Sequence, residues 1–178
     1  FHVDAESDIG NVVGALTLGE EPGFDGRLER VDLSRLPLQR LAGGASLYGA
    51  LDLDADLRLR AGGPVGDARF EALDGSFSAD TLPIAIPFQR LRGTLRFAED
   101  GSLTVEDVEL EGPMLSGRVS GGTGPGPSVW LAPLDLEVHL EARDRNLRPA
   151  LRSAGVPLRA DGSVDVRVVG NLAAPVIR

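Results

Sequence analysis

The sequence predicts a mainly β protein: one curved antiparallel sheet of roughly a dozen strands, with one or two short helices, forming an open trough or a taco-like meander. Leu and Val recur at every second position through many short segments, which is the period of a strand with one buried face. The chain has 23 glycines in 178 residues, against about 7% in an average protein. Many of them fall between the alternating segments, where turns are needed.

The segment 93–121 predicts three consecutive strands. Leu95 and Phe97 alternate with polar neighbours, and the turn-forming residues of 99–101 follow directly. A second strand comes next, and after Gly and Pro interrupt it the alternation resumes at 115–119. Apolar alternation therefore sets the register of this meander.

The second of these strands, 103–110, contains one residue too many for strict alternation. Its apolar positions are two residues apart at first and then three apart, with the extra residue at Glu106 or Asp107. One extra residue in one strand of a pair is the signature of a β-bulge. We therefore expect a bulge at this point.

The rest of the N-terminal half follows the same pattern. Further strands are expected at 12–18, 27–33, 47–59 and 68–72. Gly and Pro predict loops or turns at 19–26, 62–66 and 77–88, and a single helical turn at 36–41.

The C-terminal half contains the one convincing helix, of about two turns. Asp144 or Asn146 can cap it, Leu147 and Leu151 give it an apolar stripe, and Gly155 ends it. Around it we expect a glycine-rich turn at 121–127, strands at 134–140 and 162–169, and an extended piece at 170–177.

We expect one domain over residues 1–178, built from two weak repeats at about 27–92 and 93–178. Pentapeptides that begin at Gly49, Gly93 and Gly162 share the order glycine, small, apolar, charged, apolar. Such self-similarity is typical of repeated strand-and-turn units.

A curved sheet of this kind would carry Leu and Val inside and Asp, Glu and Arg outside. An apolar interior left unfilled would mark a site for lipid or for a partner. The predicted lining of this trough is Leu51, Leu53, Leu57, Leu95, Phe97, Leu103, Val105, Val108, Leu110, Leu136, Val138, Val164 and Val166.

Composition excludes several function classes. All 18 cationic residues are Arg, so neither a P-loop lysine nor a Schiff base is possible, and the lack of Cys removes thiol and Fe–S chemistry. A net charge of −9 with one Trp and one Tyr argues against nucleic-acid binding. We predict no cofactor and no metal.

No run of about 18 apolar residues is present in the sequence, so no segment of it is expected to span a membrane. The chain begins at Phe1, which suggests a fragment whose signal or membrane anchor would lie upstream.

A calcium loop at Asp52, Asp54 and Asp56 is considered and rejected. Their spacing fits, but such a loop needs glycine at its sixth position and a bidentate acid at its twelfth. Those positions hold Leu57 and Gly63. The outer face of a strand explains the pattern better.

Three other candidate sites are also rejected. His139 alternates with glutamates on the polar side of its strand, so we expect it to face solvent. Glycines 122, 124 and 126 have a proline among them and no helix after them, unlike a dinucleotide fingerprint. Glutamates 106, 109 and 111 occupy ordinary polar strand positions, so no catalytic residue is assigned.

The segments GTLRF, DGSLTVEDVELEGPMLSGRVSG, SVWLAPLDLEVHLEARDRNLRPALRSAG and DGSVDVRVVGNLAAPVIR follow one another from residue 93 to the end. In this order they resemble the C-terminal part of the type II secretion system protein N family, in the branch related to AsmA-like proteins. VDLSRLPLQRL and GALDLDADLRLR are similar to the family's earlier repeat.

This resemblance implies the periplasmic domain of an inner-membrane-anchored protein of a Gram-negative-type bacterium, acting in the general secretion pathway. It brings no catalytic motif. The first hypothesis is a structural or assembly subunit that contacts other type II secretion subunits. The second is an AsmA-like module that binds or transfers lipid in an apolar trough, and an enzyme ranks third. A trough plugged along its whole length would exclude lipid transfer through it.

Overall fold

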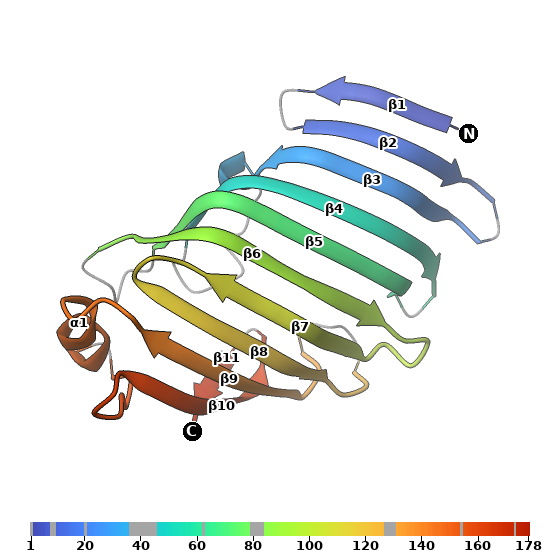
Figure 1. The fold of residues 1–178 in the computed structure, drawn as a ribbon. Helices are drawn as coiled ribbons and strands as arrows, with labels where there is room; N and C mark the ends of the chain where they lie inside the picture. Colours follow the sequence, from blue (N-terminus) through green and yellow to red (C-terminus); the bar gives the residue numbers. More distant parts are fainter. Residues whose placement is uncertain are drawn as a thin grey trace.

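The described strands of this chain form one antiparallel sheet. The computed structural model describes residues 2–7, 10–19, 21–35, 46–61, 63–78, 84–126, 131–153, 155–172 and 174–178. Within them, eleven strands lie side by side in the order in which they occur in the sequence (Figure 1). The predicted mainly β fold with a curved antiparallel meander is confirmed.

Every strand pairs with its neighbours in sequence. The strands are β1 His2–Ser7, β2 Gly10–Thr17, β3 Gly23–Asp32, β4 Ser46–Arg60, β5 Gly63–Ser78, β6 Ile86–Phe97, β7 Leu103–Glu111, β8 Leu115–Thr123, β9 Leu134–Ala142, β10 Ser163–Asn171 and β11 Ala174–Ile177. A 3-10 turn, η1 (Leu33–Arg35), follows β3, and one helix, α1 (Leu147–Ser153), connects β9 to β10.

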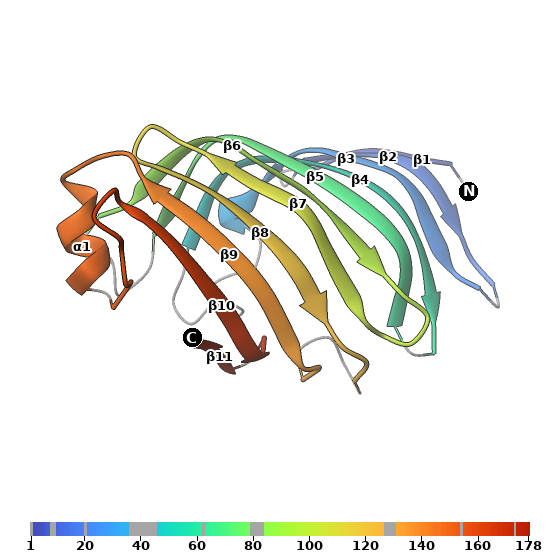
Figure 2. The same cartoon turned by 60° about the horizontal axis from the view of Figure 1, so that its bottom comes forward.

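Figure 2 shows that the sheet arches, with η1 beneath the arch. Among the described residues, three other than glycine have positive φ, namely Arg30 (55°), Asp74 (49°) and Asp107 (49°). Each stands beside a shift in strand register. Such bulges bend a strand and increase its twist. The bulge predicted at Glu106 or Asp107 is confirmed, whereas those in β3 and β5 were not predicted.

The two faces of the sheet differ in polarity. A row that runs through the register on one face consists of Leu51, Ala72, Leu91, Leu110, Gly117, Leu140 and Val164. The adjacent row, on the other face, consists of Asp52, Glu71, Arg92, Glu109, Arg118, His139 and Asp165. We call the faces that carry these rows the apolar face and the polar face.

The apolar face is the concave one, because both helical elements pack against it. Leu33 of η1 forms a buried cluster with Ala72 and Phe88. Leu147 and Leu151 of α1 form another with Ile86, Leu115 and Ala142.

Both ends of α1 are as predicted. The amide of Asn146 donates to the carboxylate of Asp144 at 2.8 Å, which caps the turn that leads into the helix. Gly155 has φ +85° and its amide donates to the carbonyl of Arg152 at 3.0 Å. Glycine adopts this left-handed conformation at a helix end with little strain.

The boundaries of several predicted loops are wrong, because residues at their edges belong to strands. Backbone pairing with a long neighbouring strand keeps these residues extended in spite of their Gly and Pro content. Gly23 to Gly26 belong to β3, Gly63 to Gly66 to β5, and Gly121 to Thr123 to β8. In the predicted loop 77–88, both ends lie in strands. Pro87 is tolerated there because the pairing of β6 with β7 begins only at Arg90.

Two further points concern the N-terminal half. Strand β1 was not predicted, and it pairs along its whole length with β2. The helical turn predicted at 36–41 lies outside the described residues.

Candidate functional site

All thirteen residues predicted to line a trough lie on the concave apolar face. Alternation and register place them there, in β4, β6, β7, β9 and β10. They share this face because the register of each strand pair puts the apolar residues of one strand opposite those of the next. Val105 and Val108 point the same way although three residues apart, since the bulge at Asp107 restores the alternation.

The concave face carries no charged side chain among the described strand residues of β2 to β10. Alternation and register assign its positions to Leu, Val, Ile, Phe, Ala, Pro and Gly, and to one hydroxyl, that of Thr123. That hydroxyl accepts a hydrogen bond from the amide of Leu103 at 3.1 Å. A surface of this composition offers dispersion and hydrophobic contact.

A cavity of about 200 Å³ opens on this face beside the clusters of η1 and α1. Its lining is entirely apolar: Leu47, Phe77, Ile86, Phe88, Leu91, Val108, Leu110, Leu115, Gly117, Val119 and Leu140. Since a water molecule occupies about 30 Å³ in the liquid, the volume matches about seven waters, but the walls offer them no side-chain partner. Such a cavity suits a segment of an alkyl chain.

Sequence reasoning identified only two of these cavity residues as lining, Val108 and Leu110. Ile86 and Phe88 were assigned to a loop because Pro87 stands between them, although they alternate as strand residues do. Leu115 and Val119 were correctly placed in a strand. The lining role of these residues depends on the long pairing of β5, β6 and β8, which alternation in a single segment does not reveal.

The concave face is covered at one edge and open in its centre. The side chains of Leu33, Phe88 and Leu147 are at most 3% exposed. Leu53, Phe70, Leu95, Val105 and Val138 in the middle of the sheet are only partly buried. The described side chains therefore do not fill the trough along its whole length.

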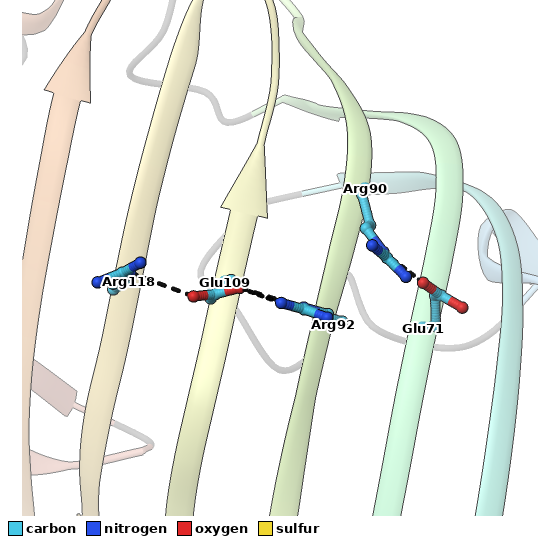
Figure 3. A network of polar contacts seen from close by, with 5 residues as sticks. All are labelled: Glu71, Arg90, Arg92, Glu109 and Arg118. Atoms are coloured by element: carbon cyan, nitrogen blue, oxygen red, sulfur yellow. Dashed lines mark hydrogen bonds and ion pairs between the residues drawn. The ribbon is translucent and has the colours of Figure 1, made fainter.

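The polar face is a network of ion pairs. Nη2 of Arg92 lies 2.6 Å from Oε2 of Glu109, and Nε of Arg118 lies 3.2 Å from Oε1 of the same carboxylate (Figure 3). Arg90 pairs with Glu71 one strand further along. The hydrogen bond from Arg92, helped by the positive charges of Arg92 and Arg118, lowers the pKa of Glu109 below its ordinary value. Exposed pairs of this kind hold a surface together weakly.

The rejected metal and catalytic candidates belong to this polar face. Asp54 pairs with Arg27 at 2.9 Å, and Asp52 accepts the backbone amide of Arg30 at 2.8 Å. Within the described ranges no group of three or more His, Asp or Glu residues is arranged to hold a metal ion. The predicted explanation of Asp52, Asp54 and Asp56 as the outer positions of a strand is confirmed.

His139 also lies on the polar face, as predicted. Its Nδ1 is 2.6 Å from Oδ1 of Asp165, and Nη1 of Arg159 is 2.6 Å from the other oxygen of that carboxylate. Hydrogen bonds from His139 and Arg159 lower the pKa of Asp165. This exposed His–Asp–Arg group forms part of the ion-pair network.

Comparison with known proteins gives no match: no family model, curated protein or solved structure is similar to this chain. Among the described residues, no helix has the length and apolar character required to cross a membrane.

Proposed function

We propose that this chain is a non-enzymatic domain whose concave face binds the alkyl chains of lipids. The observation that carries the proposal is the uncharged concave face from β2 to β10, whose central side chains are only partly buried. A contiguous apolar surface that stays in contact with solvent is costly, so it is typical of a binding site.

The energetics favour an elongated apolar ligand. Each methylene group moved from water to an apolar surface contributes about 0.8 kcal/mol, so affinity grows with chain length. The strands cross the arch side by side, and the apolar surface therefore continues from strand to strand (Figure 2). An alkyl chain can lie along it, with part of the chain in the cavity lined by Val108 and Val119.

The cellular setting that we propose follows the resemblance described above. The domain would stand in the periplasm, held by an anchor in the inner membrane, and would handle lipid as an AsmA-like module. The separation of an apolar inner face from an ion-paired outer face supports such a role, since the outer face keeps the sheet soluble while the inner face shields the chain.

The test combines lipid identification with a pair of neighbouring substitutions. Val119 lies on the concave face and lines the cavity, whereas the next residue, Ser120, is exposed on the polar face. Mass spectrometry of the natively purified chain should find retained lipid, and a fluorescent fatty acid should bind in titration. Val119→Asp should lose both signals, and Ser120→Asp should keep them.

Because Val119→Asp could also destabilise the sheet, Val119→Phe provides a second variant that fills the cavity without adding charge. It should reduce fatty-acid binding while circular dichroism stays that of the wild type. Fatty-acid binding that is equally strong in all three variants would refute the proposal.

A second candidate function is a structural or assembly subunit of the type II secretion machinery. It is favoured by the open sheet, in which β1 and β11 stand at the two ends of the strand order and each has one described neighbour. Strand edges with free backbone groups can pair with another chain. Partners would then be other secretion subunits.

Site-specific photo-crosslinking separates this candidate from lipid binding. A photoreactive residue at Val176 in β11, which is 51% exposed, should capture a secretion subunit in the envelope if this edge is an interface. The same residue at Ser120 on the polar face is the control. Equal capture from both positions, or none from Val176, would count against an interface at this edge.

A further inference from the structure

The segment around α1 is strongly cationic within an acidic protein. Residues 143–153 contain four arginines and one aspartate, a net charge of +3, in a chain whose net charge is −9. The other 167 residues therefore carry −12. A local reversal of this size attracts anions to one edge of the molecule.

The four arginines have different roles. Arg148 donates to the backbone carbonyls of Ala142 at 3.3 Å, Ala160 at 3.4 Å and Asp161 at 2.6 Å, so it secures the connection from β9 to β10. Arg143 faces the glutamates of the polar face, in a groove with Glu111 and Glu141 among others.

The remaining two arginines are available to a partner. Arg145 and Arg152 are exposed, and no acidic residue in the described part of the chain pairs with either of them. Arg145 lies two residues before α1 and Arg152 lies in its last turn, so both belong to the same short segment. Their guanidinium groups add cationic surface without serving the fold.

The side of α1 that carries its two leucines faces the apolar site. Leu147 and Leu151 are buried in a cluster with Ile86 and Leu115, and both of these partners also line the cavity on the concave face. A helix with its side chains is about 10 Å across, so α1 stands between Arg152 and two residues that line the cavity. In both views α1 stands beside the adjoining ends of β9 and β10 (Figures 1 and 2).

We propose that α1 docks this edge of the sheet on the phosphate layer of an anionic lipid bilayer, through Arg145 and Arg152. Two exposed arginines with no surrounding pocket suit a layer of many phosphates better than one enclosed ligand. A bilayer also supplies alkyl chains beside its anionic surface, so it matches both sides of α1. Both leucines of α1 are buried in the protein, so attachment is electrostatic and does not require their insertion.

Docking on a bilayer is a property additional to alkyl-chain binding, and vesicle binding can be measured separately from fatty-acid binding. The purified chain should co-sediment with phosphatidylcholine vesicles that contain phosphatidylglycerol, and hardly with phosphatidylcholine alone. Binding should weaken steeply with added salt, because exposed charges are screened. Arg145→Gln with Arg152→Gln should reduce the affinity about 25-fold, since each arginine near an anionic surface contributes about fivefold.

The matched control removes the same charge elsewhere. Arg58 and Arg69 are exposed residues of β4 and β5 that form no ion pair with the described residues, and Arg58→Gln with Arg69→Gln should bind anionic vesicles within about twofold of the wild type. Equal losses in the two double variants would refute docking by α1.

Binding of the wild type to immobilised polyglutamate but not to vesicles would also overturn docking on a bilayer and would assign the surface to an acidic protein. Fatty-acid titration of the Arg145/Arg152 variant should match the wild type, so failure of docking and failure of the alkyl-chain site give different results.

Discussion

The phenyl ring of Phe70 lies over Gly93, its register partner on the neighbouring strand. A β-carbon added to Gly93 would stand 3.0 Å from Cζ and 3.1 Å from Cε1 of this ring. Phe88 covers Gly75 in the same way. Glycine thus lets an aromatic ring lie flat on the sheet, which gives apolar cover at the concave face while keeping the trough shallow.

Gly93→Val is therefore expected to destabilise the fold. The first added carbon would already stand 2.4 Å from Cγ2 of Val108, so Phe70 and Val108 would both have to move. Overpacking of this kind typically costs about 1–3 kcal/mol. Urea denaturation should show this loss in the free energy of unfolding.

The control for this substitution is Gly124→Ala, because the nearest atoms to a β-carbon there belong to Pro133 and lie 3.9 Å away. It should change the free energy of unfolding by less than about 0.5 kcal/mol. If Gly93→Val proved as stable as Gly124→Ala, the two contacts of an added β-carbon with the ring of Phe70 would not limit the packing at this position.

The same pair of residues shows what the sequence could and could not predict. The strand at 94–97 and the side chains that share its face follow from alternation, which is a local property. Its true start at Ile86 does not, because backbone pairing with β5 holds Pro87 in an extended strand. The thirteen predicted lining residues share one face for the same local reason, whereas the cavity needs side chains from strands far apart in sequence.

Arg30 and Asp74 mark a second limit of sequence reasoning. Both have positive φ at bulges that help to curve the sheet, yet neither is a glycine. Leu28 and Val31 around Arg30 are three residues apart, as Val105 and Val108 are around Asp107, so the bulge in β3 had a spacing signal that sequence reasoning missed. The residue type gave none, because an arginine is not typical of the left-handed region. Curvature and the bulge at Asp107 were thus predicted, but the bulges at Arg30 and Asp74 were not.

Asp107→Val should destabilise the bulge in β7. Asp107 has φ 49°, a conformation in which a β-branched residue is strained. The expected cost is about 1–3 kcal/mol in the free energy of unfolding, measured by urea denaturation.

Asp107→Gly and Asp107→Asn remove the same charge and are the matched controls, since both residues accept positive φ. They should unfold within about 1 kcal/mol of the wild type. If Asp107→Val proved as stable as Asp107→Gly, the bulge would have to adopt another conformation in solution.

Acid should weaken the polar face through Glu109. Its pKa is lowered in the folded protein, first by the hydrogen bond from Arg92, so the unfolded chain binds more protons than the folded one as the pH falls. The contribution is present above the ordinary glutamate pKa of about 4.3 and is lost as the pH falls through the lower folded value. Glu109→Gln should therefore lose less stability than the wild type when the pH is lowered through this range.

Urea denaturation at a series of acidic pH values measures this difference. Glu111→Gln is the control, because Glu111 is exposed on the same strand and forms no ion pair with the described residues. Its pH dependence should follow that of the wild type. Identical curves for Glu109→Gln and the wild type would mean that the Arg92 contact is not maintained in solution.

Leu147→Ala should release α1 from the concave face. Leu147 is fully buried, in contact with the cluster around Ile86 and Leu115 that also borders the cavity. Replacing a buried leucine by alanine costs about 2–5 kcal/mol through lost burial and the space left behind. Hydrogen exchange should show faster opening of the backbone amides of α1, all but that of Pro149, since α1 has only seven residues and depends on this packing. Leu131→Ala is the control, because Leu131 is 59% exposed and should tolerate the change within about 0.5 kcal/mol. If α1 retained its protection in Leu147→Ala, the helix would have to be held by its polar contacts, chiefly the three carbonyl bonds of Arg148.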